Sequence, residues 1–388
     1  MRKKLRISVV GINGIPARHG GFETCVDNVA TRHSSAGLQV TVYCRSRNVT
    51  FDDKYYCGIK LVKLQSIGHK SLETISHTFL SLLHMLFQRK DIIHVYGVGN
   101  SIFIPFLKIL GQKVVTSVDS LDWEREKWGK FAKWFLFNSA KIAVTFSDAV
   151  IVDSKSVQEY YKRVFKTETV YIPYGADMGR NADEGVLKKY GLTKDNYILF
   201  VGRLIPEKGV HRLIDSYVKL NTKKELVIIG GDWFTTEYIE TLKQKAAGSN
   251  VRFLGFVYGD ECRAVYSGAY LYVQPSEVDG TSPALLTAMG TGNCVVVNSI
   301  KENLETVGEA GLNYECNSAD SLRERLQYLL DNKLIVDEYR QKALDRIKTV
   351  YSWDRVADSI AAVYEDILSG KKPRIDIYEN PTSIDSVP

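Results

Sequence analysis

Short apolar runs alternate with longer stretches of helical periodicity along most of the chain. In the first part, runs typical of buried strands occur at residues 5–10, 40–44, 60–65, 91–96, 113–118, 149–153 and 169–173. In the second part they occur at residues 197–201, 225–229, 251–254, 269–274 and 293–297. Helical patterns of roughly 10–15 residues separate most of these runs, as connections between parallel strands require. The pattern predicts an α/β protein with parallel, doubly wound sheets.

The length of the chain favours two domains. A chain of 388 residues, 45% of them apolar, can supply two hydrophobic cores. We place the first domain at residues 1–176, the second at 177–350, and a further helix at 351–370. The polar, proline-punctuated segment 371–388 is predicted to be a disordered tail.

One loop of the second domain carries an acidic residue directly before a helix. Glu277 follows the strand pattern at 269–274, and Gly280, Thr281, Ser282 and Pro283 then break it. Ser282 is a suitable N-cap and Pro283 a suitable first helical residue. Loops at the carboxyl ends of parallel strands bind ligands, and a helix N-terminus suits phosphate. Glu277 then either binds sugar hydroxyls or is a solvated loop residue.

A second loop supplies cations. The strand at 197–201 leads into Gly202-Arg203-Leu204-Ile205-Pro206-Glu207-Lys208-Gly209, and a helix pattern follows. Arginine can grip a phosphate through two hydrogen bonds, and lysine acts as a point charge. Cations for a diphosphate and a carboxylate for hydroxyls together describe a nucleotide-sugar site.

With these motifs the chain resembles the retaining, family 4 bacterial glycosyltransferases of the GT-B fold. The match rests on the G-R-L-x-x-x-K-G motif and on the Glu-loop-Pro-helix motif, and it extends to about residue 368. The stretches GIPARHGGFET and VDSLDWEREKWGKFAKW are most similar to a subgroup of rhamnosyltransferase-like enzymes of polysaccharide assembly.

The resemblance implies two Rossmann-like domains with the active site in a cleft between them, and a terminal helix that crosses back to the first domain. The first domain faces the acceptor and the second binds the nucleotide sugar. Arg203 and Lys208 would stabilise the leaving nucleoside diphosphate without an essential metal, and transfer would retain the anomeric configuration by front-face attack. Asp119 stands where many relatives carry a histidine near the donor sugar, or it is a turn aspartate. The expected substrate-binding residues are Gly20, Gly21, Gly202, Gly231, Phe256, Gly280, Thr281 and Ser282, with Arg18 and His19 beside the first two.

One position departs from the family pattern. A second glutamate, which grips the ribose hydroxyls in the family, is replaced by Thr287. A deoxyribose lacks the 2′-hydroxyl, so a dTDP-sugar loses less from this change than a UDP- or GDP-sugar. The sequence thus favours a dTDP-sugar, with rhamnose as the candidate sugar. The alternative is that water or a neighbouring side chain replaces the glutamate.

The expected function is sugar transfer to a lipid-linked or polysaccharide acceptor in bacterial cell-surface glycan synthesis. Two alternatives remain: a nucleotide-sugar epimerase or hydrolase of the same fold, and a non-catalytic sugar-binding module. The net charge of +6 suits phosphates or an anionic membrane, and no nucleic-acid motif is present. The six scattered cysteines are expected to be reduced, buried thiols of a cytosolic protein.

Two segments raise the question of membrane contact. The region 123–146 combines Trp, Phe and Lys, which suits either a membrane interface or a core helix with solvated lysines. The helix pattern at 71–87 is apolar around much of its circumference, which favours a buried packing helix over a membrane-contact helix. No stretch of about 20 apolar residues occurs, so we expect at most peripheral attachment to the inner face of the plasma membrane.

Overall fold

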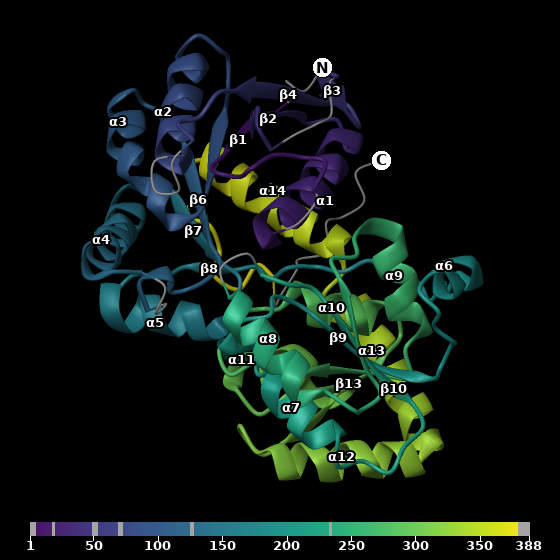
Figure 1. Cartoon of the computed structure of the whole chain (residues 1–388). Helices are drawn as coiled ribbons and strands as arrows, with labels where there is room; N and C mark the ends of the chain where they lie inside the picture. Colours follow the sequence, from purple (N-terminus) through teal and green to yellow (C-terminus); the bar gives the residue numbers. More distant parts are fainter. Residues whose placement is uncertain are drawn as a thin grey trace. The chain divides into compact units, whose positions relative to one another are not determined.

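The structure is a computed structural model that describes residues 5–17, 20–48, 53–68, 73–124, 128–232 and 235–378. The chain divides into two compact units (Figure 1). The first unit ends at Tyr174 and takes up the chain again at Trp353, while the second runs from Gly175 to Ser352. Arg18 and His19 lie outside the described residues.

The first unit contains a sheet in the order β3-β4-β2-β1-β5-β6-β7-β8, in which only β3 is antiparallel to its neighbour. The order reverses between β1 and β5, so loops at their carboxyl ends diverge to opposite faces. The strands are β1 Arg6–Val10, β2 Gln39–Arg45, β3 Tyr55–Tyr56, β4 Ile59–Leu64, β5 Ile92–Tyr96, β6 Val114–Val118, β7 Ala149–Val152 and β8 Val170–Tyr171.

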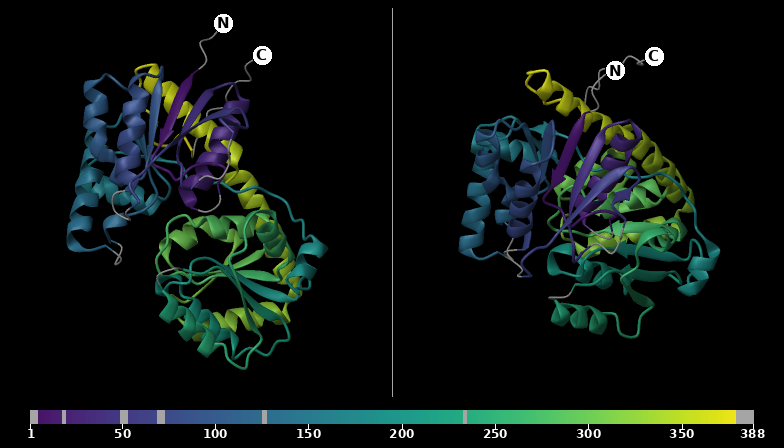
Figure 2. Two further views of the ribbon diagram at one scale, coloured as in Figure 1. Left: turned by 45° about the horizontal axis from the view of Figure 1, so that its top comes forward. Right: turned by 90° about the horizontal axis from the view of Figure 1, so that it is seen from above.

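Helices cover both faces of this sheet (Figure 2). Successive side chains of β5 point to opposite faces of the sheet. Ile93 and Val95 pack in a core with residues of α2 and α3, whereas His94, between them, hydrogen-bonds to Tyr364 of α14 on the other face. Helix α14 also packs against α1. The helices are α1 Gly21–Ser35, α2 Glu73–Leu86, α3 Ile104–Ile109, α4 Lys130–Phe146, α5 Lys155–Phe165 and α14 Trp353–Leu368, with 3-10 turns at Val98–Phe103 and Asp122–Glu124.

The second unit has an all-parallel sheet in the order β11-β10-β9-β12-β13-β14, which reverses between β9 and β12. Its strands are β9 Tyr197–Val201, β10 Glu225–Ile229, β11 Val251–Gly255, β12 Leu271–Gln274, β13 Cys294–Asn298 and β14 Leu312–Tyr314. Its helices are α6 Glu184–Lys189, α7 Val210–Tyr217, α8 Thr236–Lys245, α9 Gly259–Gly268, α10 Pro283–Gly290, α11 Lys301–Val307, α12 Ala319–Asp331 and α13 Lys333–Val350. The predicted α/β class with two doubly wound parallel sheets is confirmed.

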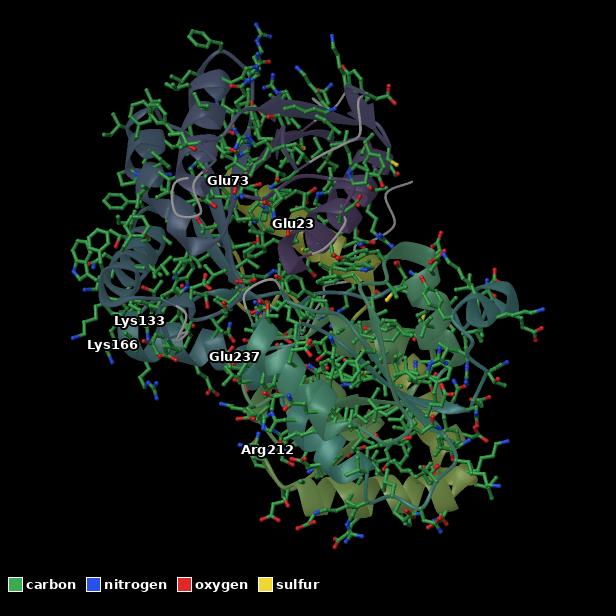
Figure 3. The ribbon with its side chains drawn as sticks, viewed as in Figure 1. Glu23, Glu73, Lys133, Lys166, Arg212 and Glu237 are labelled. Atoms are coloured by element: carbon green, nitrogen blue, oxygen red, sulfur yellow. The ribbon has the colours of Figure 1, made fainter. Side chains whose placement is uncertain are left out.

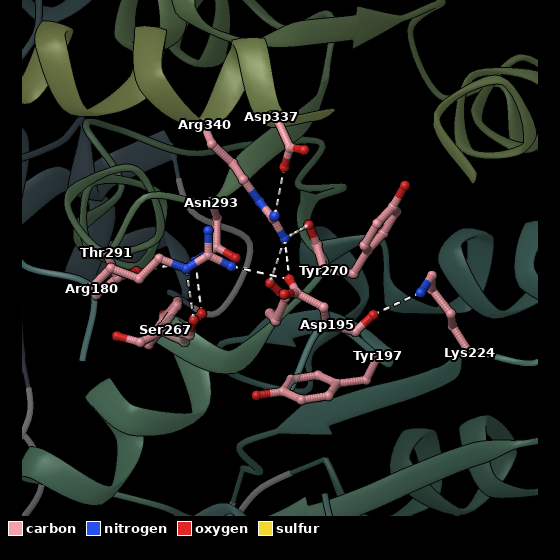
Figure 4. Close-up of polar contacts among 12 residues, drawn as sticks. Arg180, Asp195, Tyr197, Lys224, Ser267, Tyr270, Thr291, Asn293, Asp337 and Arg340 are labelled. Carbon is pink, nitrogen blue, oxygen red and sulfur yellow. Dashed lines mark hydrogen bonds and ion pairs between the residues drawn. The ribbon is translucent and has the colours of Figure 1, made fainter. Parts of the chain in front are cut away.

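A polar network anchors α13 to the sheet of the second unit (Figure 4). The Arg340 side chain is 9% exposed, and its guanidinium pairs with Asp195 and, at 2.9 Å, with Asp337. It also donates to the carbonyl oxygen of Tyr270 at 2.8 Å, and Arg180 pairs with Asp195 at 3.1 Å. A buried guanidinium needs such partners, because an unpaired charge in the interior is costly.

Three expectations about local structure are wrong. The helical region predicted from residue 123 begins only at Lys130, and Trp123 is a core residue that packs against Phe137 and Phe165. The beginning of the predicted disordered tail is ordered, because Ile377 and Tyr378 are each 2% exposed. Residues 379–388 lie outside the described residues.

The third wrong expectation concerns the helix pattern at 71–87. The α2 helix buries one side only, at Leu82 and Met85, and exposes an apolar opposite side. Of the six cysteines, Cys25, Cys44 and Cys294 are buried thiols as expected, whereas the other three are at least partly accessible. In the part of the chain that the structure describes, no helix is long and apolar enough to cross a membrane.

Candidate functional site

Two loops of the second unit meet where its strand order reverses. The loop after β9 contains Arg203 and Lys208, and the loop after β12 contains Glu277 and the residues up to Ser282. The Glu277 N–H donates to the carbonyl oxygen of Glu207 at 2.8 Å. The two loops that carry the predicted cations and carboxylate are therefore joined directly, at the position where open α/β sheets bind ligands.

Gly209 makes this contact between the loops sterically possible. Its φ is +67°, and a Cβ atom placed on it would lie 2.1 Å from the carbonyl oxygen of Pro275. Only glycine has both the conformational freedom and the lack of a side chain that this close approach requires. The final residue of the G-R-L-x-x-x-K-G motif thus fixes how the first loop packs on the second.

Lys208 forms an ion pair across the junction with Asp279. The distance from Nζ to Oδ2 is 2.7 Å, and the two side chains are 16% and 12% exposed. Asp279 also accepts a hydrogen bond from Gln274 Nε2 at 2.8 Å, and its other oxygen accepts from the Gly280 N–H at 3.2 Å. A carboxylate that accepts from three donors is held in one position.

Gln274, the last residue of β12, connects this pair to the start of α10. Its Nε2 atom lies 3.1 Å from Ser282 Oγ, and its Oε1 accepts from the Tyr272 hydroxyl at 2.5 Å. Ser282 is the N-cap of α10, with its hydroxyl accepting from the Leu285 N–H, and Pro283 is the first helical residue. The predicted helix start is confirmed. Gly280, Thr281 and Ser282 therefore lead into a capped helix N-terminus beside the Lys208–Asp279 pair.

Glu277 has different partners. Its carboxylate pairs with Arg212 of α7 and lies 3.8 Å from His211 Nε2. Figure 3 labels Arg212 on α7. Burial lowers the pKa of His211, and the positive charge of Arg212 lowers it further. The structure thus brings Glu277 to the loop junction, but it pairs Asp279, and not Glu277, with Lys208.

Arg203 is exposed, and among the described residues it has no hydrogen-bond or ion-pair partner. Arg203 follows Gly202, whose backbone packs closely against Gly230, the residue directly after β10. A Cβ atom on Gly230 would come within 1.9 Å of the Gly202 carbonyl oxygen. An arginine whose five N–H donors are uncommitted can take an anionic ligand without first breaking a salt bridge.

The predicted contacts Gly231 and Phe256 lie against each other. A Cβ atom on Gly231 would be 3.0 Å from the tip of the Phe256 ring, so a larger residue there would displace it. Phe256 and Tyr258 stack with ring centroids 5.9 Å apart and planes 7° apart, and they are 44% and 54% exposed. Exposed, parallel rings at the edge of a site offer a flat apolar surface for a planar ligand group.

In the first unit, the loop after β1 is tied to the start of α1. Asn13 donates to the Glu23 carboxylate through its backbone N–H and its side chain, each at 2.8 Å, and Figure 3 labels Glu23 on α1. Gly20 precedes α1 at φ +101°, and Gly21 lies against the ring of Tyr174. Both predicted glycines therefore lie at the carboxyl edge of this sheet.

Asp119 lies at the same edge, directly after β6. It accepts from the Ser120 hydroxyl at 3.2 Å. Burial raises the pKa of the Tyr174 phenol well above its usual range, and the carboxylates of Asp119 and Asp153 add to the shift. Tyr174, Asp153 and Tyr96 line one pocket of this unit. His94, expected to be structural, is buried between Tyr364 and Ser117, and burial lowers its pKa to about 3.

Comparisons with known proteins bear on these loops. Residues 184–350, nearly the whole second unit, match the family model "Glycosyl transferases group 1". The second unit is therefore similar in sequence to the group 1 glycosyltransferases. Residues 4–177 match a model described as a domain of unknown function (DUF1972).

Two curated relatives show the range of similarity. An uncharacterized glycosyltransferase of Methanocaldococcus jannaschii is 29% identical over 231 residues, which cover 56% of this chain and 59% of that protein. O-antigen chain mannosyltransferase C of Escherichia coli is 23% identical over 385 residues, which cover 92% of this chain and 97% of that protein. Several other curated relatives are matched over only 48% to 65% of their own length.

Among solved structures, HepE of Anabaena in complex with UDP and glucose is similar with a TM-score of 0.77 and 17% identity, covering 94% of this chain and all of that one. This likeness establishes the GT-B glycosyltransferase fold, with its two Rossmann-like units.

In the second unit, sequence reasoning missed Asp279, Gln274 and Arg212. The signal for Asp279 was its place directly before Gly280, closer to the helix than Glu277. Thr287, on the second turn of α10, donates to the Pro283 carbonyl oxygen at 2.8 Å and is partly accessible. Among the described residues, no group of three or more His, Cys, Asp or Glu side chains is arranged to hold a metal ion.

Proposed function

We propose that this protein is a glycosyltransferase that moves a sugar from a nucleoside diphosphate to an acceptor hydroxyl in cell-surface glycan synthesis. The observation that carries the proposal is the meeting of the loop that contains Arg203 and Lys208 with the loop that leads into the N-terminus of α10, where the sheet of the second unit reverses. Two cations and a helix N-terminus suit a diphosphate. The HepE neighbour, a protein of the same fold, binds UDP and glucose.

In the proposed reaction, the bond between the anomeric carbon and the β-phosphate oxygen breaks, and that oxygen keeps the electron pair. Arg203 and Lys208 stabilise the growing negative charge, which lowers the barrier. The acceptor oxygen bonds to the anomeric carbon from the same face, and its proton passes to the departing phosphate. The configuration is retained, and no side chain of the protein serves as the nucleophile.

We assign the carboxylate of the donor-sugar site to Asp279. It sits beside Lys208 and between two hydrogen-bond donors, so it can accept from sugar hydroxyls next to the diphosphate. The sequence-based expectation that Glu277 binds the sugar is not part of this proposal, because its carboxylate pairs with Arg212. Asp279→Asn is therefore expected to lower turnover by about 10²-fold or more, a loss of roughly 3 kcal/mol, while Glu277→Ala retains most of it. Equal losses in both variants would contradict the assignment.

The proposed donor is dTDP-rhamnose and the proposed acceptor is a lipid-linked saccharide. Thr287 cannot accept hydrogen bonds from two ribose hydroxyls as a carboxylate can. A deoxyribose nucleotide, which lacks the 2′-hydroxyl, therefore loses the least binding energy from this change. Phe256 and Tyr258 would receive the planar base.

The test is a turnover assay with a panel of dTDP-, UDP- and GDP-sugars, each with and without a lipid-linked acceptor. Mass spectrometry of the products is the readout. A glycosylated acceptor with release of the nucleoside diphosphate supports the transferase. Sugar release or isomerisation without acceptor would instead identify a hydrolase or an epimerase, and binding without turnover would identify a non-catalytic module.

A further inference from the structure

The first unit exposes an apolar surface on one flank that its fold does not cover. On α2, Phe79, Leu80, Leu83 and Leu86 are 39% to 47% exposed, and the adjoining Phe87 is 87% exposed. These positions are three or four residues apart along the helix, so they share one side. Between Thr74 and Gln88 the sequence contains no Asp, Glu, Lys or Arg. An ordinary surface helix carries charges on its solvent side.

The two following helices extend this surface. On α3, Phe106 and Ile109 are 47% and 83% exposed, and on α4, Phe131 and Trp134 are 78% and 61% exposed. The rings of Phe131 and Trp134 stack with centroids 5.9 Å apart. Helices α2, α3 and α4 all contact the 3-10 turn at Val98–Phe103, and Figures 1 and 2 show them on the same flank. We call the exposed apolar side chains of α2, α3 and α4 the apolar flank.

The segments that carry the apolar flank have an excess of basic residues. Residues 73–90, 104–113 and 130–148 hold seven Lys or Arg and two acidic residues, whereas the whole chain is nearly balanced at 51 to 45. Helix α4 has Lys130, Lys133 and Lys141 and no acidic residue. In the described part of the chain, Lys130 and Lys133 have no ion-pair partner, and Figure 3 labels Lys133. These cations are available to an external anion.

We propose that the apolar flank of α2, α3 and α4 docks on the surface of an anionic phospholipid bilayer. Trp and Phe rings are stable at the depth of the headgroups, and lysines beside them meet lipid phosphates. A second copy of the chain suits the surface less well, because a symmetric contact would bring the lysines of one copy toward those of the other. This inference concerns a surface of the first unit and holds whether or not the proposed transfer reaction is correct.

Flotation with vesicles tests the proposal. The full-length protein is mixed with vesicles of phosphatidylcholine alone or of equal parts phosphatidylcholine and phosphatidylglycerol, at low and high salt. The wild type is expected to float with the anionic vesicles at low salt and to float less at high salt, because salt screens the lysines. Wild-type protein that stays at the bottom with anionic vesicles at low salt overturns the proposal.

Variants separate the two contributions. Lys130→Gln with Lys133→Gln is expected to weaken partitioning about 25-fold, at roughly fivefold per lysine. Leu83→Ser with Phe131→Ser and Trp134→Ser is expected to abolish flotation. The matched controls are Leu334→Ser, at a position 84% exposed on α13, and Lys188→Gln with Lys348→Gln in the second unit. Controls that float like the wild type support the proposal, and an apolar-flank triple variant that floats like the wild type overturns it.

Analytical ultracentrifugation without vesicles distinguishes a bilayer from a second copy. A monomeric wild type supports docking on lipid. A wild-type dimer that the triple substitution converts to monomer assigns the apolar flank to self-association and overturns the proposal. Because the substituted side chains are exposed or, at Lys133, partly exposed, the melting temperature of each variant is expected to match that of the wild type, and a soluble acceptor analogue should be turned over equally.

Discussion

The ion pair between Lys208 and Asp279 links the two loops of the proposed donor site, and its removal has a calculable effect. With Nζ and Oδ2 2.7 Å apart, the Coulomb attraction is about 6 kcal/mol at an effective dielectric constant near 20. Most of this offsets the desolvation of two largely buried groups, and removing one partner of a fully buried pair costs about 3–5 kcal/mol. Asp279 would keep two other donors, at Gln274 and Gly280. We therefore expect Lys208→Met to destabilise the second unit by about 2 kcal/mol.

A double-mutant cycle measures this coupling. Urea unfolding of the wild type, Lys208→Met, Asp279→Asn and the double variant is followed by circular dichroism, with the transition of each unit fitted separately because two units need not unfold together. A favourable coupling energy of about 1–2 kcal/mol is expected. Additive single effects would refute the ion pair. Turnover by Lys208→Met is expected to fall about 10²–10³-fold, since in the proposed reaction the lysine also stabilises the leaving diphosphate, and unchanged turnover would refute that part of the reasoning.

Three further predictions concern single positions. Gly209 has φ +67° and faces the Pro275 carbonyl oxygen, so Gly209→Ala should lower both the melting temperature and the affinity for the donor. A variant with unchanged melting temperature and affinity would show that the close contact between the two loops is not required. Arg340→Ala should lower the free energy of unfolding by about 3 kcal/mol in urea denaturation, because it removes the ion pairs of a largely buried guanidinium and leaves the buried carbonyl oxygens of Ala269 and Tyr270 without this donor; a loss below about 1 kcal/mol would contradict this. In calorimetric titrations the wild type should prefer dTDP to UDP, and Thr287→Glu should gain affinity mainly for UDP; tighter binding of UDP by the wild type would rule out the dTDP preference.

The sheets were predictable because their strands are buried on both faces. Such strands read as continuous apolar runs, so 197–201 and 225–229 coincide with β9 and β10. The loops at the reversal were also predictable, because cations and a helix N-cap stand where the strand pattern ends. Which carboxylate reaches Lys208 was not, because Glu277 and Asp279 are two residues apart and the loop backbone decides which of them turns inward.

The surface of the first unit shows another limit of sequence patterns. The apolar circumference of α2 looks the same whether the helix is buried or exposed, and only the structure shows Phe87 and Leu83 uncovered. Trp123 shows the opposite error. It belongs to an aromatic and basic stretch typical of a membrane interface, but it packs in the core, because the chain forms a 3-10 turn before α4 begins. Tyr378 is similar: its segment is polar, yet the ring packs against Tyr171.

Binding of a nucleoside diphosphate by Arg203 tests the central claim most directly. Calorimetric titration with dTDP compares the wild type with Arg203→Met, and Arg323→Met on the surface of α12 is the matched control. A charge-assisted hydrogen bond contributes about 1.5–3 kcal/mol, so the dissociation constant of Arg203→Met should rise roughly 10- to 150-fold, while that of Arg323→Met stays unchanged. Equal affinities in all three proteins would contradict the placement of the donor diphosphate at the reversal between β9 and β12.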